Sequence, residues 1–148
     1  MKLAIVIEGE QNSGKTSTIK YLLNYQQARL WMKNHIILSN NFNSINVFAE
    51  AISSSPTERK EYLPVTLGNS TPDFLIIAEQ KGGAFLSSTY AYLNTNSYYI
   101  ITFKLTNIVG ANIWDRWTSP LDEVSRLQAR KDEIIKAIIN FIKVNNII

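Results

Sequence analysis

One local pattern near the start of the chain constrains its fold more than any other feature. The run Leu3–Ile7 is apolar, rich in branched residues and without apolar–polar alternation. Such a strand is covered on both faces, as in the centre of a parallel sheet. Glycines and small polar residues follow at 9–14, and a helical spacing of apolar side chains begins after Lys15. This predicted strand–turn–helix unit indicates an α/β fold.

The turn itself carries a motif. Residues 9–16 read GEQNSGKT and fit G-x-x-x-x-G-K-[ST] at every fixed position, directly after a strand and before a helix, as the motif requires. The segment resembles the phosphate-binding loop, or Walker A motif, of P-loop NTPases. The resemblance implies a three-layer α/β fold, in which a mostly parallel sheet of about four to five strands is flanked by helices. An ordinary strand-to-helix turn is the alternative.

The composition of this loop suits a phosphate group. Glycines permit a sharp turn and a close approach to the anion, and the N–H groups from Gln11 to Thr16 can point inward. Lys15 would supply a mobile cation to the outer phosphates, and the Thr16 hydroxyl a ligand for Mg²⁺. The residues that we expect to bind the nucleotide are Gly9, Gln11, Asn12, Ser13, Gly14, Lys15, Thr16 and Ser17.

A second buried strand, Phe74–Ala78, ends in Glu79. Ligands of open parallel sheets bind at the carboxyl ends of the strands. P-loop proteins usually place an acidic residue there to hold magnesium through water, although Asp is commoner than Glu. We therefore expect Glu79 to help place the metal together with Thr16, or to act as a base that orients water or an acceptor hydroxyl. An exposed loop carboxylate is the alternative.

A tryptophan-flanked arginine follows the last predicted strand, in the segment Trp114-Asp115-Arg116-Trp117. P-loop kinases often bring an arginine from such a region onto the nucleotide, so Arg116 joins Lys15 and Glu79 as a candidate catalytic residue. The resemblance is incomplete, because kinases of that branch carry several arginines in a lid. We interpret the two tryptophans as packing or interface residues before base-stacking ones.

Two further arginines, Arg126 and Arg130, lie four residues apart on the predicted final helix. They could reach phosphates, but Asp122 and Arg126 have the spacing of a solvated helix pair, which we prefer. His35 has no visible partner, and we interpret it as a loop or packed residue.

The region 26–67 has two interpretations. Gln26–Lys33 extends the first helix or starts another, and Ile36–Leu38 forms a strand. Ser55-Pro56-Thr57-Glu58 has the pattern of a capping box and opens a short helix that closes before Pro64. Alternatively, Ile45–Ile52 and Lys60–Leu67 form two arms of a hairpin.

The remaining elements are clearer. The sequence predicts helices over Lys15–Tyr25 and Ala84–Leu93, a strand over Tyr98–Leu105, and a long helix that starts at Ser119. The final helix has an apolar stripe. Its members are Leu121, Val124, Leu127, Ile134, Ile135, Ile138 and Ile142.

Composition excludes several classes of protein. With 148 residues, we expect a single domain over 1–148. The absence of cysteine excludes disulfides and thiolate sites, and one histidine makes a Ser-His-Asp triad improbable. The net charge of +3, without basic clusters, is too weak to indicate a nucleic-acid partner. No apolar stretch predicts a membrane span, and we expect a cytoplasmic protein.

The sequence thus leads to two hypotheses of function. In the first, the chain binds ATP or another NTP with Mg²⁺ and either transfers a phosphoryl group to a small-molecule acceptor or hydrolyses the nucleotide. It resembles the compact nucleotide-kinase branch, because the guanine motif Asn-Lys-x-Asp and the ABC signature are missing. In the second, it is a non-catalytic module that regulates a protein partner. A degenerate loop that binds only phosphate or sulfate is a third interpretation. The oligomeric state is open, a homodimer included.

Overall fold

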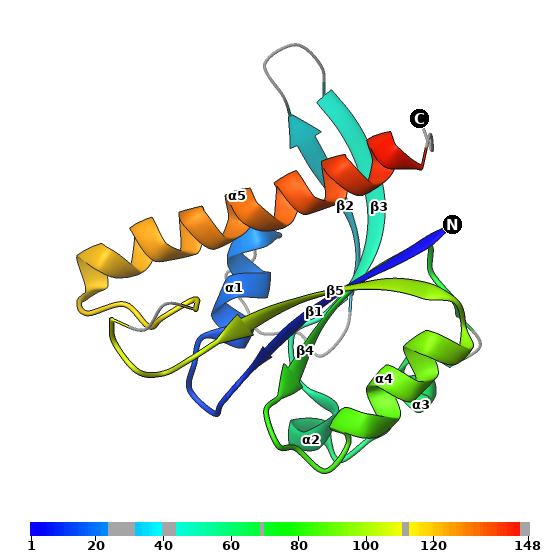
Figure 1. The fold of residues 1–148 in the computed structure, drawn as a ribbon, viewed down its shortest axis with the longest axis horizontal. Helices are drawn as coiled ribbons and strands as arrows, with labels where there is room; N and C mark the ends of the chain where they lie inside the picture. Colours follow the sequence, from blue (N-terminus) through cyan, green and yellow to red (C-terminus); the bar gives the residue numbers. More distant parts are fainter. Residues whose placement is uncertain (24–31, 40–43, 69, 111–112, 146–148) are drawn as a thin grey trace.

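The structure, a computed structural model, describes residues 1–23, 32–39, 44–68, 70–110 and 113–145. Strands and helices are interspersed along these ranges (Figure 1). In chain order the elements are β1 (Lys2–Gly9), α1 (Lys15–Leu22), β2 (Met32–Ser39), β3 (Ser44–Ile52), α2 (Pro56–Arg59), α3 (Leu63–Leu67), β4 (Phe74–Gln80), α4 (Leu86–Thr95), β5 (Tyr98–Leu105) and α5 (Pro120–Val144).

The strands form a sheet in the order β2-β3-β4-β1-β5. Neighbours among β3, β4, β1 and β5 are parallel, whereas β2 pairs antiparallel with β3 at one edge. As predicted, β1 lies between two parallel strands, and its residues Leu3–Ile7 are at most 1% exposed. Glu8 lies beside Glu79, and Gly9 beside Gln80. The carboxyl end of β4 is therefore next to the glycine loop.

Helices cover both faces of this sheet (Figure 1). Leu3, Ile5 and Ile7 point to the face where Ile19 of α1 and Ile138 of α5 pack. The intervening β1 residues point to the opposite face, where side chains of α3 and α4 pack, because successive side chains of a strand alternate between faces. The fold is thus α/β, with a four-stranded parallel sheet flanked by helices.

The structure decides between the two interpretations of region 26–67. The predicted hairpin of Ile45–Ile52 with Lys60–Leu67 is wrong, because β3 pairs with β2 and β4, and residues 63–67 form α3. The predicted helix start is confirmed, since the Ser55 side chain caps α2. Our helix over Gln26–Lys33 is wrong at Met32 and Lys33, which belong to β2 and pair with β3. Residues 24–31, with Tyr25 of the predicted first helix, lie outside the described ranges.

The last helix, α5, is longer than the sheet that it covers. As predicted, its apolar stripe is buried at Ile134, Ile138 and Ile142. At Leu121 and Val124 the prediction is wrong: they are 90% and 59% exposed, because the first turns of α5 extend past the sheet (Figure 1). Among the described residues, no helix combines the length and apolar character that a bilayer crossing needs.

Candidate functional site

The loop between β1 and α1 folds around a cavity that we call the cup. Its volume is about 320 Å³. The cup is lined by Gln11, Asn12, Ser13, Gly14, Lys15, Thr16, Ser17 and Glu58. The sequence predicted a nucleotide contact for every one of these residues except Glu58, which belongs to α2 and lies far along the chain.

The backbone of the cup favours an anion. φ is 63° at Asn12 and 90° at Gly14, both in the left-handed region. Gly14 is the N-cap of α1, and no side chain caps this end of the helix. The first N–H groups of α1 therefore lack a side-chain acceptor, and the positive end of the helix dipole borders the cup. A phosphate oxygen is a suitable acceptor for these groups.

Close packing explains why the motif has glycine at both of its glycine positions, Gly9 and Gly14. A Cβ atom on Gly9 would lie 2.4 Å from Ser13 Oγ, which is buried and has no hydrogen-bond partner. A Cβ atom on Gly14 would lie 2.9 Å from the ring of Trp117. Any larger residue at either position would therefore displace the loop or the side chain packed against it.

Lys15 is folded back onto its own loop. Its side chain lines the cup, and Nζ donates a hydrogen bond of 2.8 Å to the carbonyl of Glu10. Burial lowers the pKa of Lys15, while the carboxylates of Glu58 and Glu79 oppose this effect. The ammonium thus has one neutral acceptor, and an anion in the cup would offer it a stronger one.

Thr16 and Ser55 hold α2 against the cup. Thr16 Oγ1 donates to the carbonyl of Ser53 at 2.7 Å, just after β3. Ser55 Oγ accepts from the backbone N–H of Glu58 at 3.2 Å, which is the predicted capping bond. These two contacts place Glu58 at the cup, where its negative charge opposes the lowering of the Lys15 pKa by burial.

Glu79 is a buried residue of β4, and not the exposed loop carboxylate of the alternative interpretation. Its exposed fraction is 0%. Thr89 of α4 donates to Oε1 at 2.5 Å, whereas Oε2 is buried without a partner. Burial raises the pKa of Glu79 to about 7, although the Thr89 hydrogen bond and the charge of Arg59 both lower it. A carboxyl group that titrates near neutral pH can hold a metal or exchange a proton.

More unpaired polar atoms lie in and just before α2, which packs on β4. With Glu79 they form a set that we call the Glu79 flank: Ser54, Thr57, Arg59 and Glu79. Besides Glu79 Oε2, the buried atoms of this set without a partner are Ser54 Oγ, Thr57 Oγ1, and Nε and Nη2 of Arg59. Arg59 Nη1 donates to the carbonyl of Ser54. Gly83 packs tightly on this set, since a Cβ there would lie 2.3 Å from Thr57 Oγ1.

On the α1 side of the loop lies a second set, the Arg130 flank: Trp114, Asp115, Trp117 and Arg130. The Arg130 guanidinium is 5.7 Å from the Trp114 ring and 5.5 Å from the Trp117 ring. It donates to Thr18 Oγ1 at 2.9 Å and to the Asp115 carbonyl at 2.8 Å. Our solvated interpretation is therefore wrong for Arg130, which is 3% exposed and joins α5 to α1.

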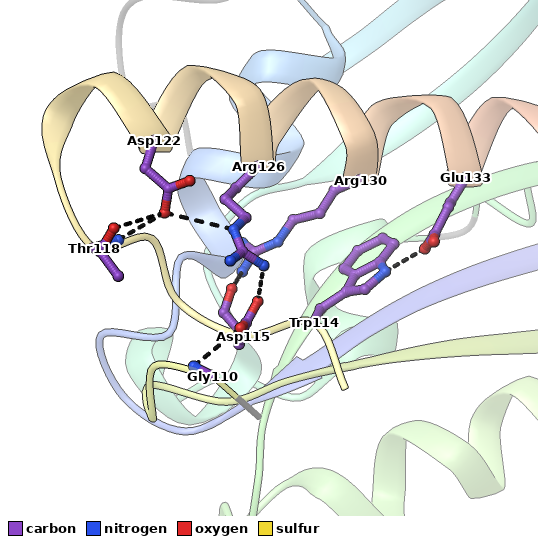
Figure 2. A network of polar contacts seen from close by, with 8 residues as sticks. All are labelled: Gly110, Trp114, Asp115, Thr118, Asp122, Arg126, Arg130 and Glu133. Atoms are coloured by element: carbon purple, nitrogen blue, oxygen red, sulfur yellow. Dashed lines mark hydrogen bonds and ion pairs between the residues drawn. The ribbon is translucent and has the colours of Figure 1, made fainter. Parts of the chain in front are cut away.

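The neighbouring ion pairs fasten the loop before α5 to that helix (Figure 2). Arg126 pairs with the buried carboxylate of Asp115 and, at 3.5 Å, with Asp122. Asp122 also accepts from the backbone N–H of Thr118 at 2.8 Å. The predicted Asp122–Arg126 pair is thus present, within a network that extends to the backbone N–H of Gly110.

The three candidate catalytic residues lie in different places. Lys15 lines the cup, and Glu79 is close enough to affect its pKa. The Arg116 guanidinium lies 5.9 Å from the Trp117 ring and does not line the cup. The tryptophans pack as expected, since Trp114 stacks on Phe103 at 4.6 Å between ring centres.

Two charged residues near the cup escaped the sequence analysis, Glu58 and Arg59. The capping box marked the start of α2 but carried no information about which element α2 would face. That depends on contacts distant in the chain, such as the bond between Thr16 and Ser53. Comparison of the chain with protein-family models, with curated proteins and with solved structures finds no match.

Proposed function

We propose that the chain binds a nucleoside triphosphate in the cup, as P-loop NTPases do, and transfers or hydrolyses its terminal phosphate. One observation carries the proposal: the GEQNSGKT loop forms an uncapped, anion-favouring helix start with Lys15 inside it. The neighbouring parallel strand β4 ends beside this loop with the buried carboxyl of Glu79. ATP is the default ligand, because no residue pattern in the chain selects a base.

The donor set also fits magnesium. Thr16 supplies a hydroxyl oxygen, and Glu79 supplies the buried Oε2 that has no partner. The described residues contain no cluster of three or more His, Cys, Asp or Glu side chains that would bind a metal alone. This is expected of Mg²⁺ held mainly by phosphates and water. When bound, the ion would neutralise charge on the phosphates.

The chain's own residues would then act by position and charge. The amide groups of residues 11–17 would bind the phosphates, and Lys15 would leave the Glu10 carbonyl for the outer phosphate. The Glu58 carboxylate would repel an anion in the cup, so it is not suited to bind the phosphates. We therefore assign it to positioning the nucleophile, where it would orient water or an acceptor hydroxyl. Arg59, rather than Arg116, is the arginine on the flank where the nucleophile would enter.

One observation favours the second function, a non-catalytic module for a protein partner. Arg116 lies on Trp117 instead of in the cup, so the loop before α5 brings no arginine to the phosphates. In that case the Trp114–Trp117 segment would transmit nucleotide binding to the partner, because Trp117 contacts the loop at Gly14. This function predicts binding without turnover.

A thermal-shift panel tests the proposal. Nucleoside mono-, di- and triphosphates are compared with and without Mg²⁺, on the wild type and on Lys15→Ala, with Lys20→Ala as the control on the same helix. We expect a shift that is largest for a triphosphate, requires Mg²⁺ and is lost only in Lys15→Ala. Phosphate release from the nucleotide that shifts most then separates enzyme from binding module. Equal, weak shifts for phosphate and all nucleotides would support the degenerate loop and contradict the proposal.

A further inference from the structure

A different part of the molecule, the outer edge of β5, is available for pairing. β5 is the last strand of the sheet and pairs with β1 along its whole length. On its other side, within the described part of the chain, the partner is an isolated bridge between Leu105 and Trp114. The backbone from Tyr98 to Lys104 therefore presents an edge without a strand beside it.

This edge lacks the usual protection against pairing. Proteins commonly protect edge strands with several charges, a proline, a bulge or a short strand. β5 has eight residues, one charged residue near its end (Lys104), no proline and an unbroken register with β1. Its Tyr99 side chain is 61% exposed. An edge of this kind is suited to accept another strand.

A groove runs along the same edge, between β5 and the last turns of α5. It consists of two adjoining hollows of about 340 and 690 Å³, which share Ile101, Ala137 and Asn140. We call it the β5–α5 groove. Its apolar wall consists of Tyr99, Ile101, Phe103, Phe141 and Val144. Alternate side chains of an added strand could enter the groove from this edge, since they all point to one face.

The charged side chains that line the groove determine which kind of partner can bind there. Lys2, Lys136 and Lys143 line the two hollows. Among the residues that the structure describes, Glu133 is the acidic residue that lines them, and it accepts a hydrogen bond from Trp114 Nε1 (Figure 2). A second copy of this chain would bring the same lysines against each other, which opposes pairing of two β5 edges.

We propose that the β5–α5 groove binds an extended segment of a partner protein that carries both apolar and acidic side chains on the face turned to α5, and that adds to the sheet beside β5. The backbone edge would supply main-chain hydrogen bonds, the apolar wall would take the apolar side chains of that face, and Lys136 and Lys143 of α5 would attract the acidic ones on the same face. The proposal rests on contacts outside the cup, so it stands or falls independently of nucleotide binding.

A labelled synthetic peptide tests it. The probe is the octapeptide Val-Thr-Glu-Thr-Val-Thr-Glu-Thr, whose valines and glutamates share one face of a strand, titrated with the full chain by fluorescence polarisation at low salt. We expect a Kd in the range of about 10 to 100 µM that weakens as salt is added. A lysine peptide with lysine in place of each glutamate and the isomer Val-Thr-Thr-Glu-Val-Thr-Thr-Glu should bind at least about tenfold more weakly, because the first reverses the charge and the second turns the glutamates to the opposite face.

Charge-reversed variants locate the site. Lys136→Glu with Lys143→Glu should weaken the probe at least about tenfold, whereas the matched pair Lys20→Glu with Lys60→Glu should change it less than about twofold. Hydrogen exchange should show new protection on β5 amides between 99 and 104 when the probe is bound.

Several results would overturn the proposal. They are no binding at millimolar probe, equal binding of the lysine peptide, or protection elsewhere than on β5. A dimer in light scattering whose β5 amides are protected without the probe would also overturn it, since a second copy would then occupy the edge.

Discussion

The Arg130 flank and the Glu79 flank of the cup differ in whether their buried polar atoms have hydrogen-bond partners. Arg130 shares its guanidinium between Thr18, the Asp115 carbonyl and two indole rings. On the other flank, Glu79 Oε2 and two nitrogens of Arg59 are buried without a partner. A buried polar atom left unpaired costs about 1–3 kcal/mol. The Arg130 flank thus stabilises the loop, whereas the Glu79 flank carries a cost that a ligand or solvent could relieve.

This difference indicates which flank stabilises the loop and which flank takes part in ionisation or turnover. Natural chains break the rule of polar satisfaction mainly at functional sites. Among the described residues, most of the unpaired buried atoms belong to the Glu79 flank, and the others are Ser13 Oγ and Thr66 Oγ1. Glu58, which lines the cup, lies between Thr57 and Arg59 of this flank in the sequence. We therefore expect changes on the Arg130 flank to alter stability, and changes on the other side to alter ionisation or turnover.

The largest effect should follow from breaking the Arg130 flank. Arg130→Ala removes both hydrogen bonds and leaves a void between the tryptophans, so we expect a loss of about 4 kcal/mol in the free energy of unfolding. Urea denaturation measures it. Lys131→Ala, at the next position of α5, should cost less than about 1 kcal/mol because its ammonium makes a single contact with the Tyr21 ring at 5.8 Å. Equal costs for the two variants would contradict the comparison.

The next effect concerns the pH dependence of stability. The pKa of Glu79 rises from 4.5 to about 7 in the folded chain. The folded state then holds a proton that the unfolded state releases, so stability falls as pH rises through this window. Glu79→Gln removes that loss and should gain on the order of 3 kcal/mol relative to the wild type between pH 4.5 and 8. Urea titrations in EDTA, without nucleotide, measure the difference.

Glu61→Gln serves as the control for this titration, because Glu61 is a partly exposed carboxylate beyond α2. Its stability difference from the wild type should change less between the two pH values than that of Glu79→Gln. A Glu79→Gln variant with the same behaviour would mean that the carboxyl group ionises normally despite its burial.

A third prediction separates binding from chemistry. If Glu58 orients the nucleophile, Glu58→Gln should lower turnover about 100-fold, which is about 2.7 kcal/mol. Nucleotide affinity should stay equal or increase, because a negative charge has left the cup. Single-turnover phosphate release and equilibrium binding measure the two quantities. Unchanged turnover in an active wild type would exclude this role for Glu58.

The smallest effect concerns the cap that places Glu58. Ser55→Ala loses the bond to the Glu58 N–H and should cost about 1 kcal/mol of stability. Turnover should fall less than in Glu58→Gln, since Thr16 still contacts the Ser53 carbonyl. Ser87→Ala, at an exposed position of α4, is the control for thermal denaturation and should be neutral. A neutral Ser55→Ala would show that the cap is dispensable.

Local patterns explain which parts of this fold were predictable. The strands at Leu3–Ile7 and Phe74–Ala78 were identified because branched apolar runs require burial on both faces. The glycine loop was identified because its motif is contiguous and lies between a strand and a helix. The capping box at Ser55 was read correctly for the same reason: all its partners lie within one turn.

The failures depended on contacts between distant segments. Pairing of β2 with β3 overrode the helical interpretation of Met32–Lys33. Arg130 is buried and donates to Thr18, a residue 112 positions away, so its helix spacing carried no sign of burial. Glu58 reaches the cup because the segment before α2 is bound to Thr16 through the Ser53 carbonyl. The motif predicted the anion-binding loop, and tertiary packing determined which charges surround it.

The most direct test of the account is a calorimetric titration of the wild type and Lys15→Ala with the magnesium complex of the triphosphate that gives the largest thermal shift. We expect one binding site per chain in the wild type. We also expect affinity at least about 100-fold weaker in Lys15→Ala, because the charge-assisted contact to the outer phosphate is lost. Absence of binding by the wild type at millimolar nucleotide, or equal affinity in the two proteins, would contradict it.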